Sequence, residues 1–463
     1  MPQAQATTAA RRLAEFATGL RYEDIPAEHV DRARQCVIDT VGACLFGSRL
    51  QWGRIVTAYA RHYGSGGASR IMGTPHAVAA PLAALANGVF AHAFELDSLR
   101  KPGAGVHPGA TLLPPALAIA DELELDGKAV LAAFVAGCEV MFRIGVASRH
   151  SSEALGFHAP GLTGPFGAAV VAGRLLGLNA AQLSNALGIA GSLCGGLLAF
   201  AKAGNGAMVK RLHMGRASEA GILAARLALE GYEGPDTVLE GKFGFLETYC
   251  RDTDPARLTD GLGTRWETAN ICLKRYSCHI TAHTPVQTMQ ELRREHGFTG
   301  DDIAQLTVLA GAKVLSHHAL HEPKDIAAAQ YSVPFCTALA AYHEAGDPRV
   351  FSERTLTDAR VMALCKAIRL GLLDDPQFRH SGWASRVIVK LKDGRELARA
   401  ADDFKGTPAS PLTPQELQEK FLCMAADFSG AAALFDQLMA LDAVGNCRTL
   451  ALAGTAPATD RGP

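Results

Sequence analysis

The chain has 463 residues, of which 48% are hydrophobic, and its 45 lysines and arginines nearly balance its 46 aspartates and glutamates. A chain of this length exceeds what one ordinary hydrophobic core can organise, so we expect two domains. The net charge of −1, without any block of like charges, argues against a nucleic-acid-binding surface. Any site for an anion must therefore be local.

The cysteines and the N-terminus indicate a cytoplasmic protein. There are eleven cysteines, an odd number without a Cys-x-x-Cys pair, which predicts reduced thiols in a reducing compartment. Residues 1–10 lack a basic region followed by an apolar run, and Pro81 and Asn87 interrupt the most apolar stretch, residues 76–94. We therefore expect neither a secretory signal nor a membrane span.

Helical patterns dominate the first part of the chain. Residues 26–46 begin with Pro26 at a plausible first helical position and carry apolar residues at three- and four-residue spacing, which predicts an amphipathic helix. The pattern recurs at 128–147, at 180–190 after the cap residue Asn179, and at 216–229 before Gly231. A run of Ala, Gly and Val predicts another helix at 168–176.

The character of the chain changes after Lys274. Residues 303–309 mix Val, Leu and Thr, and residues 387–391 and 396–398 flank Asp393-Gly394, which predicts a β-hairpin. We expect a smaller α+β domain here. Thr413-Pro414-Gln415-Glu416 is a capping box with proline at the first helical position, so the chain is expected to return to the helical domain.

The predicted fold is mainly α, with a large all-helical domain built from both chain ends and an inserted smaller α+β domain. The predicted boundaries are 1–272 for the first helical part, 273–403 for the α+β lid domain and 404–453 for the helical return. Residues 454–463 are small, polar and contain proline, which predicts a disordered tail.

Positive charge gathers in the apolar segment 206–217, which contains Lys210, Arg211 and Arg216 among Gly, Ala, Met and Leu. A lysine in such surroundings loses hydration free energy unless it meets an anion, so Lys210 predicts an anion site. The alternative is a lysine whose stem covers apolar surface while its ammonium group, with the two arginines, lies on a solvated helix face.

Two histidines lie in segments rich in glycine and proline. His107 precedes Pro108 in residues 103–110, where glycines let the backbone approach a ligand and the His-Pro step disfavours helix at the histidine. His158 lies in a turn-rich loop, residues 156–167. Imidazoles titrate near neutrality and serve as acids or bases without large tuning. The alternative for both is a loop histidine bonded to a backbone carbonyl.

Several motifs occur together in one order. They are segments 156–167 and 206–217, His107-Pro108, the block Lys274-Arg275-Tyr276-Ser277-Cys278-His279, and Ala329-Gln330-Tyr331-Ser332-Val333-Pro334. From about residue 9 to about residue 430 the chain resembles the MmgE/PrpD family, whose members include 2-methylcitrate dehydratase, cis-aconitate decarboxylase and iminodisuccinate epimerase. The resemblance implies the interrupted two-domain fold and a homodimer.

The resemblance also implies a site. His107, His158, Asp97 and Lys210 are the expected catalytic residues, and Lys274, His279, Tyr331 and Arg211 are expected to bind substrate. We expect Lys210 and Lys274 to hold carboxylates, with Asp97 orienting one of the two histidines. The family often has Asp-Asp-Thr where this chain has Asp97-Ser98-Leu99, followed here by Arg100 and Lys101, and it usually has proline where Ser277 stands. These departures leave the substrate open.

We expect a cofactor-free lyase that acts on a small di- or tricarboxylic acid. Removal of a proton next to a carboxylate needs a base and fixed cations near the developing negative charge. The resulting species can lose a β-hydroxyl, be reprotonated on the opposite face or, in the other direction, form by loss of carbon dioxide. Dehydration is the first expectation. Decarboxylation and epimerisation are alternatives, and a non-catalytic binding or scaffold protein is the alternative from another class.

Two other motifs carry less weight. His317, His318 and His321 have helical spacing, but no carboxylate completes a recognisable ligand set, so we expect no metal. The Gly64–Gly67 run lacks a phosphate-loop context, so we expect no nucleotide cofactor. The expected partners are a small anionic carboxylate substrate and a second copy of the chain, with no nucleic acid and no membrane.

Overall fold

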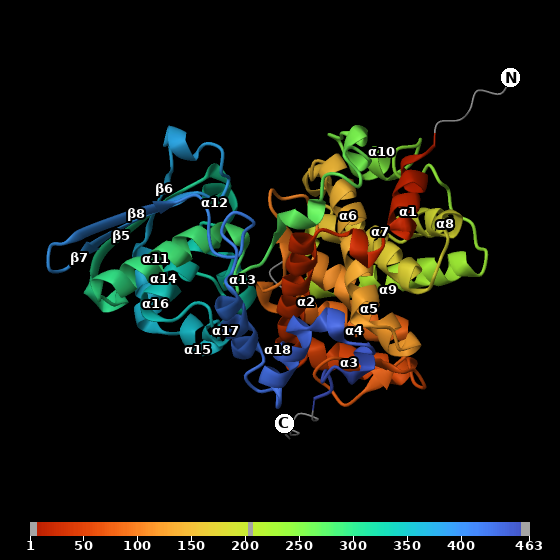
Figure 1. Cartoon of the computed structure of the whole chain (residues 1–463). Helices are drawn as coiled ribbons and strands as arrows, with labels where there is room; N and C mark the ends of the chain where they lie inside the picture. The colour runs from red at the N-terminus through yellow and green to blue at the C-terminus, as the bar shows by residue number, and fades with distance from the viewer. Residues whose placement is uncertain (1–6, 202–206, 455–463) are drawn as a thin grey trace. The chain divides into compact units, whose positions relative to one another are not determined.

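The computed structural model describes residues 7–201 and 207–454. Apart from Gly454, the tail predicted to be disordered lies outside the described residues. The structure has two compact units, which Figure 1 colours along the chain. The first contains residues 1–93, 97–272 and 425–463, and the second contains residues 94–96 and 273–424.

The first unit is helical. Its helices are α1 (Ala9–Gly19), α2 (Ala27–Gly47), α3 (Gln51–Tyr63), α4 (Ala80–Ala91), α5 (Pro108–Leu123), α6 (Gly127–Ala147), α7 (Ala159–Leu175), α8 (Ala180–Gly191), α9 (Val209–Leu229), α10 (Phe245–Tyr249) and α18 (Ala431–Met439). Two short antiparallel pairs join β1 (Ser69–Arg70) to β2 (Ala77–Val78) and β3 (Leu99–Arg100) to β4 (Ile271–Cys272). Helix α7 packs against α6, α8 and α9, at the centre of this unit (Figure 1).

Local capping rules explain where several helices begin. Asn179 caps α8, and the side chain of Gln182 closes the box by accepting from the Asn179 backbone, so the predicted cap is confirmed. Helix α2 differs by one position, because Pro26 is its N-cap residue and the first helical residue is Ala27. Proline suits this place because it has no N–H to leave unsatisfied.

Helix α7 begins earlier than predicted. Residues 159–167, expected to be loop, form its first turns, and His158 is its N-cap residue rather than part of a loop. Pro160 stands at the start of the helix, where proline is tolerated, and nearly all of α7 is buried. Burial of the backbone favours a hydrogen-bonded helix, and this outweighs the poor helix propensity of Gly and Pro.

Prolines inside α5 and α7 release backbone carbonyls to other elements. Pro165 has no N–H for the carbonyl of Gly161, and that carbonyl instead accepts from the backbone N of Gly195 at 3.2 Å. Pro114 and Pro115 likewise release the carbonyls of residues 110 and 111, and both carbonyls lie 3.3 Å from Oγ of Ser218 on α9, which can donate its one proton to either. The prolines therefore tie α7 to the loop at 195 and α5 to α9.

Helix α6 is a core helix. Among residues 7–201 and 207–454 it is the one helix long and apolar enough to cross a membrane by length and composition. In the structure, 89% of its most apolar window is buried within the protein. The stretch singled out in the sequence, residues 76–94, contains the 12-residue α4 instead.

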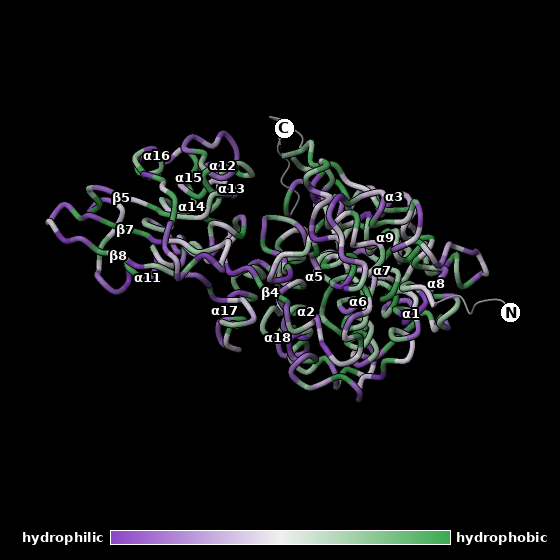
Figure 2. Tube along the Cα trace, turned by 90° about the horizontal axis from the view of Figure 1, so that it is seen from above, coloured by the Kyte–Doolittle hydropathy of each residue, from purple (hydrophilic) through white to green (hydrophobic). Residues whose placement is uncertain are grey.

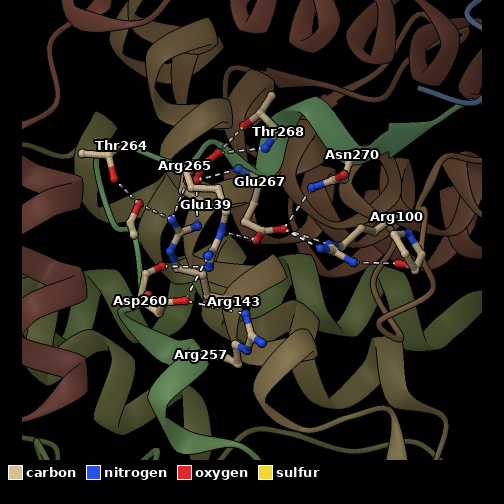
Figure 3. Close-up of polar contacts among 12 residues, drawn as sticks. Arg100, Glu139, Arg143, Arg257, Asp260, Thr264, Arg265, Glu267, Thr268 and Asn270 are labelled. Atoms are coloured by element: carbon tan, nitrogen blue, oxygen red, sulfur yellow. Dashed lines mark hydrogen bonds and ion pairs between the residues drawn. The ribbon is translucent and has the colours of Figure 1, made fainter. Parts of the chain in front are cut away.

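A buried ion network holds residues 261–270 against α6 (Figure 3). The carboxylate of Glu139 on α6 accepts from the backbone N of Glu267 at 3.0 Å and of Thr268 at 2.8 Å, and pairs with Arg143 at 2.8 Å. Arg143 also donates to the carbonyl of Arg265 at 2.7 Å. These bonds compensate for the lost hydration of two charges that are almost fully buried.

The same network neutralises Arg100, one of the residues that depart from the family pattern. Its guanidinium lies 2.7 Å from the carboxylate of Glu267. Leu99 and Arg100 form β3, the backbone N of Lys101 donates to the carbonyl of Asn270 at 2.9 Å, and Oγ of Ser98 accepts from the backbone N of Gly109 at 3.0 Å. These departures therefore serve local structure in the first unit.

The second unit contains a four-stranded mixed sheet in the order β6-β5-β7-β8, with only β5 and β6 parallel. The strands are β5 (Ile303–Ala310), β6 (Arg369–Leu372), β7 (Ser385–Leu391) and β8 (Glu396–Ala401). The helices are α11 (His283–His296), α12 (Ala312–His317), α13 (Ile326–Tyr331), α14 (Val333–Tyr342), α15 (Glu353–Leu356), α16 (Ala359–Ala367) and α17 (Pro414–Met424). Helix α11 packs on β7 and β8, and α14 packs on α11 (Figure 1).

The predicted hairpin is confirmed, since β7 and β8 pair antiparallel around Asp393-Gly394. Gly394 has φ +93, a backbone conformation that favours glycine, and Figure 2 shows the turn as a hydrophilic tip. The capping box at Thr413 and Glu416 is also confirmed, with reciprocal bonds of 2.9 and 3.1 Å at the start of α17. Residues 404–424 belong to the second unit. From the sequence they were assigned to the helical return, residues 404–453.

Candidate active site

Asp97 joins two histidines in the first unit. Its Oδ2 lies 2.7 Å from Nδ1 of His92 and 2.6 Å from Nδ1 of His107. An ionised carboxylate only accepts hydrogen bonds, so each imidazole carries its proton on Nδ1 and leaves Nε2 as the basic atom when neutral. Burial would raise the pKa of Asp97, but the two histidines outweigh it and hold that pKa well below its usual range. Asp97 is therefore a permanent carboxylate.

His92, which follows α4, is fully buried. Burial lowers its pKa to about 4, although the Asp97 carboxylate opposes this shift, and the charge of Lys210 adds to it. At physiological pH His92 is a neutral N–H donor to Asp97. Its Nε2 makes no hydrogen bond within residues 7–201 and 207–454.

His158 forms a second pair with His213. Their Nδ1 atoms lie 3.0 Å apart, so one ring donates to the other and the pair shares one proton at this contact. The backbone N of His158 donates to the carbonyl of Gly196 at 3.0 Å, which fixes the start of α7. Burial, followed by the charge of Lys210, holds the pKa of His158 well below its usual value, so its free imidazole is neutral.

Lys210 lies in the first turn of α9 and is buried. Its charge lowers the pKa of His92, His158 and His213, so it acts electrostatically on all three rings. The ring centroid of His92 is 5.0 Å from that of His107 and 6.0 Å from that of His158. The structure therefore gathers all four residues predicted to be catalytic, His107, His158, Asp97 and Lys210, in one unit.

Two helices begin directly after the predicted proton-transfer residues. His107 is the N-cap residue of α5 and His158 that of α7. The N-terminus of a helix carries partial positive charge and unpaired N–H groups, which favour a nearby anion. Together with Lys210, these helix starts give the cluster an electrostatic preference for a carboxylate.

In the second unit, Glu95 contacts two residues predicted to bind substrate, Lys274 and Tyr331, and a third, His279, lies next to Tyr331. Nζ of Lys274 lies 3.0 Å from Oε2 of Glu95, and both side chains are 3% exposed. The hydroxyl of Tyr331 donates to Oε1 of Glu95 at 3.3 Å. His279 lies 5.0 Å from the Tyr331 ring and stacks on His318 at 4.2 Å. Glu95 therefore balances the charge of Lys274, and the role of Lys274 in holding a carboxylate stays a prediction.

Arg211 has other contacts. Its guanidinium lies 5.1 Å from the ring centroid of Trp52 on α3, and its Nη1 donates to the carbonyl of Ala207 at 2.9 Å. A cation over an indole ring is a stabilising contact in itself. The side chain packs on α3. Within the described residues it makes no hydrogen bond or ion pair with Asp97, His92, His107 or His158. A substrate-binding role for Arg211 therefore has no geometric support of its own.

The MmgE/PrpD N-terminal domain matches residues 11–258, and the MmgE/PrpD C-terminal domain matches residues 276–440. The chain belongs to the MmgE/PrpD family. The mainly helical unit with a small mixed sheet in the other unit agrees with the two-domain architecture expected from the resemblance.

The family relatives include cis-aconitate decarboxylases. A cis-aconitate decarboxylase from Aspergillus terreus is 31% identical over 61% of this chain and 60% of its own length. A cis-aconitate decarboxylase-like protein from Aspergillus oryzae is 28% identical over 89% of this chain and 90% of its own. The human cis-aconitate decarboxylase is 27% identical over 88% of this chain and 86% of its own. The chain is thus homologous to cis-aconitate decarboxylases.

Three residues that contact the predicted site residues, namely His92, His213 and Glu95, were not predicted from the sequence. His213 lies three residues after Lys210, so helical spacing within the basic segment could have placed it on the same face. His92 stands alone in an apolar stretch, and such histidines are commonly structural. Glu95 has a positive φ of 56, and nothing in its local sequence indicates that a lysine 179 residues away needs a partner.

The His92, Asp97 and His107 cluster has the composition of a metal site. Their candidate ligand atoms lie within 4.8 Å of one another. Nδ1 of His92 and Nδ1 of His107 lie 2.7 and 2.6 Å from Oδ2 of Asp97, so imidazole nitrogens already surround this oxygen. The histidines at 317, 318 and 321 have separate partners, namely Ser316 Oγ, the carbonyl of Tyr331 and the carbonyl of Cys365.

We therefore expect catalysis without a metal ion. Exhaustive chelation followed by removal of the chelator should leave turnover unchanged, because two imidazole nitrogens already lie against Oδ2 of Asp97. Metal content by mass spectrometry and activity measured on the same sample provide the check. Loss of activity that a divalent ion restores would contradict the expectation and assign the cluster at Asp97 as the metal site.

His318 gives the second unit a pH-dependent stability. Burial lowers its pKa to about 4, against roughly 6.5 in an unfolded chain. Below pH 6.5 the unfolded chain binds the proton first, so the free energy of unfolding falls by about 1.4 kcal/mol per pH unit until the folded pKa is reached. Between pH 6.5 and pH 5 this histidine costs about 2 kcal/mol of stability.

The variant His318→Asn tests this effect. An asparagine amide can donate to the carbonyl of Tyr331 as Nδ1 of His318 does, at 3.1 Å in the structure, but it does not titrate. We expect its melting temperature to fall less between pH 7 and pH 5 than that of the parent. The exposed His62→Asn should retain the full fall, and equal falls in both variants would show that His318 does not contribute.

Proposed function

We propose that this chain decarboxylates a cis-aconitate-like tricarboxylic acid, with the site at Asp97, His107, His158 and Lys210. The observation that carries the proposal is homology over most of the length of both chains to proteins named as cis-aconitate decarboxylases. These relatives support decarboxylation more strongly than the dehydration that we expected first from the sequence. Family membership supports a lyase that acts on carboxylic acids in either case.

The reaction breaks the bond between a carbon and one carboxylate, and the electron pair stays on the carbon framework as carbon dioxide leaves. Conjugation with a second carboxylate spreads that negative charge. A carbon then takes a proton, so each turnover consumes one proton and releases one carbon dioxide. Lys210 and the helix starts at α5 and α7 provide fixed positive charge where the negative charge develops.

We assign the proton donor to His107. Nδ1 of His107 lies 2.6 Å from Oδ2 of Asp97. The side chain of His107 is 16% exposed, whereas that of His92, which contacts the same oxygen, has no exposed surface. A carboxylate at one ring nitrogen stabilises the imidazolium form, which then donates from Nε2. His158 is neutral in the free protein and is suited to accept a proton, as dehydration or epimerisation would require.

A panel of acids tests the proposal. Purified protein is incubated with cis-aconitate, 2-methylcitrate, citrate and iminodisuccinate, and products are followed by proton NMR together with carbon dioxide release. We expect turnover of the cis-aconitate-like acid with one carbon dioxide per product. Loss of water from 2-methylcitrate without carbon dioxide would make dehydration the function. Binding of these acids without any turnover would favour a non-catalytic binding protein.

We further propose a homodimer in the cytoplasm. All eleven cysteines are free, which suits a reducing compartment. Large apolar side chains are exposed near the start of α9, among them Leu197, Val209 and Leu212, and a second copy of the chain would cover such a surface. Light scattering at micromolar concentration is expected to give twice the chain mass, and a single chain mass would contradict the proposal.

A further inference from the structure

In the described parts of the chain, the one hydrogen bond of the His92 side chain goes to the oxygen that also lies against His107, the proposed proton donor. Nδ1 of His92 and Nδ1 of His107 lie 2.7 and 2.6 Å from the same Oδ2 of Asp97. A histidine that serves only packing would be expected to use both ring nitrogens, because a buried unpaired nitrogen costs free energy. His92 is fully buried, and within the described parts of the chain its Nε2 makes no hydrogen bond.

We propose that His92 is a positioning residue for the reaction: its Nδ1–H holds Oδ2 of Asp97 in the place where the same oxygen fixes Nδ1 of His107, so that Nε2 of His107 is presented as the proton-donating atom. The proposal rests on the proposed role of His107. It assigns a function to a side chain that the sequence pattern did not single out.

The location of His92 makes this role specific. Residues Phe94–Leu96 belong to the second unit, whereas His92 and Asp97 on either side of them belong to the first. Phe94 and Glu95 both have positive φ, so the backbone bends sharply between the two partners. The hydrogen bond between His92 and Asp97 closes this bend across five residues and fixes the carboxylate within the first unit.

Only one of the two imidazoles on Asp97 is suited to carry charge. The charged or titratable groups that act on His92 include Asp97, Lys210 and His107. Those that act on His158 include Lys210, His92, His213 and His107. His92 has no exposed surface, whereas the side chain of His107 is 16% exposed. A neutral His92 withdraws part of the Asp97 charge, so its removal should leave more of that charge to act on His107.

Two substitutions separate positioning from packing. In His92→Asn the amide nitrogen takes approximately the place of Nδ1 and still donates, whereas His92→Leu fills the space without a donor. We expect His92→Leu to lower kcat on the order of 10- to 100-fold with KM little changed, as for the loss of one hydrogen bond to a charged group. We expect His92→Asn to retain most of kcat. We expect the basic limb of the pH–rate profile, at which a proton donor loses its proton, to move upward in His92→Leu alone.

The matched control uses His321, whose Nδ1 lies 2.8 Å from the carbonyl of Cys365 in the second unit. His321→Asn and His321→Leu repeat the same two changes outside the cluster and should leave both kcat and the pH–rate profile unchanged. If His92→Leu had the parent's kcat and profile, or if His92→Asn were as slow as His92→Leu while folded, the positioning role would be wrong.

A measurement on the free protein separates this proposal from the proposed function. With ring-¹⁵N-labelled histidine, NMR reports the tautomer and the pKa of His107 without any substrate. We expect an Nδ1–H tautomer at His107 in the parent and in His92→Asn, and mixed tautomers in His92→Leu. An unaltered His107 in His92→Leu would overturn the proposal even if decarboxylation were observed. Zinc or manganese that binds the parent and displaces both Nδ1 protons would overturn it in favour of a metal site.

Discussion

Replacing His107 with glutamine is expected to lower kcat by roughly 10²- to 10⁴-fold, the range for losing general acid–base catalysis. Glutamine retains a polar group of similar reach but cannot carry a proton to the substrate. In the structure His107 lies 2.6 Å from Oδ2 of Asp97 and is the N-cap residue of α5. Rates measured by carbon dioxide release under saturating substrate would give the ratio.

His158→Gln is the matched comparison, because both histidines are N-cap residues with proline nearby at the start of the helix. For decarboxylation we expect the smaller effect at His158, since the reaction consumes a proton and His158 is neutral in the free protein. For dehydration the order should reverse. In deuterium oxide the product should gain one deuterium. Parent-like kcat and deuterium incorporation in both folded variants would make the two histidines structural.

Replacing Lys210 with alanine is expected to lower kcat/KM by on the order of a hundredfold or more, because a fixed cation near the developing charge is lost. Lys210 is buried in the first turn of α9, and its charge reaches three histidines. Removal of this charge should also raise the pKa values of His92, His158 and His213. A kinetic loss accompanied by these upward shifts would locate the ammonium group in the cluster.

Lys242→Met provides the control, because it removes an exposed lysine from the same unit. It should leave kcat/KM unchanged. Circular dichroism and thermal unfolding must show that Lys210→Ala is folded before its rate is compared. A folded Lys210→Ala with nearly normal kcat/KM would remove Lys210 from the site and favour the alternative of a lysine that only covers apolar surface.

Short-range patterns were read correctly from the sequence. The Asn179 cap, the Thr413 capping box and the Asp393-Gly394 hairpin depend on side-chain and backbone rules that act within a few residues, and each one appears in the structure. The predicted start of α7, residue 168, was wrong because the same local rules were applied to a buried segment. Gly and Pro usually end helices, and only the burial of residues 159–167 shows why a helix forms through them.

The candidate site could be predicted only in part, because the family motifs supply residues but not their partners. The sequence indicates Lys274 as a cation, whereas the structure shows Glu95 balancing it from 179 residues away. The sequence suggests that Asp97 orients one histidine, whereas in the structure Asp97 holds two. Such partners depend on long-range packing, and no local spacing rule specifies them.

The prolines inside α5 and α7 create a conflict between helix stability and the anchoring of the site. An alanine at position 165 would be favoured in an isolated helix by about 3 kcal/mol. Its restored N–H would, however, compete for the Gly161 carbonyl that now binds the loop at Gly195, and the next glycine, Gly196, accepts from the backbone N of His158. Substitutions ranked by helix propensity alone would therefore weaken the backbone hydrogen bonds between the loop at Gly195 and Gly196 and α7, which hold His158 in place.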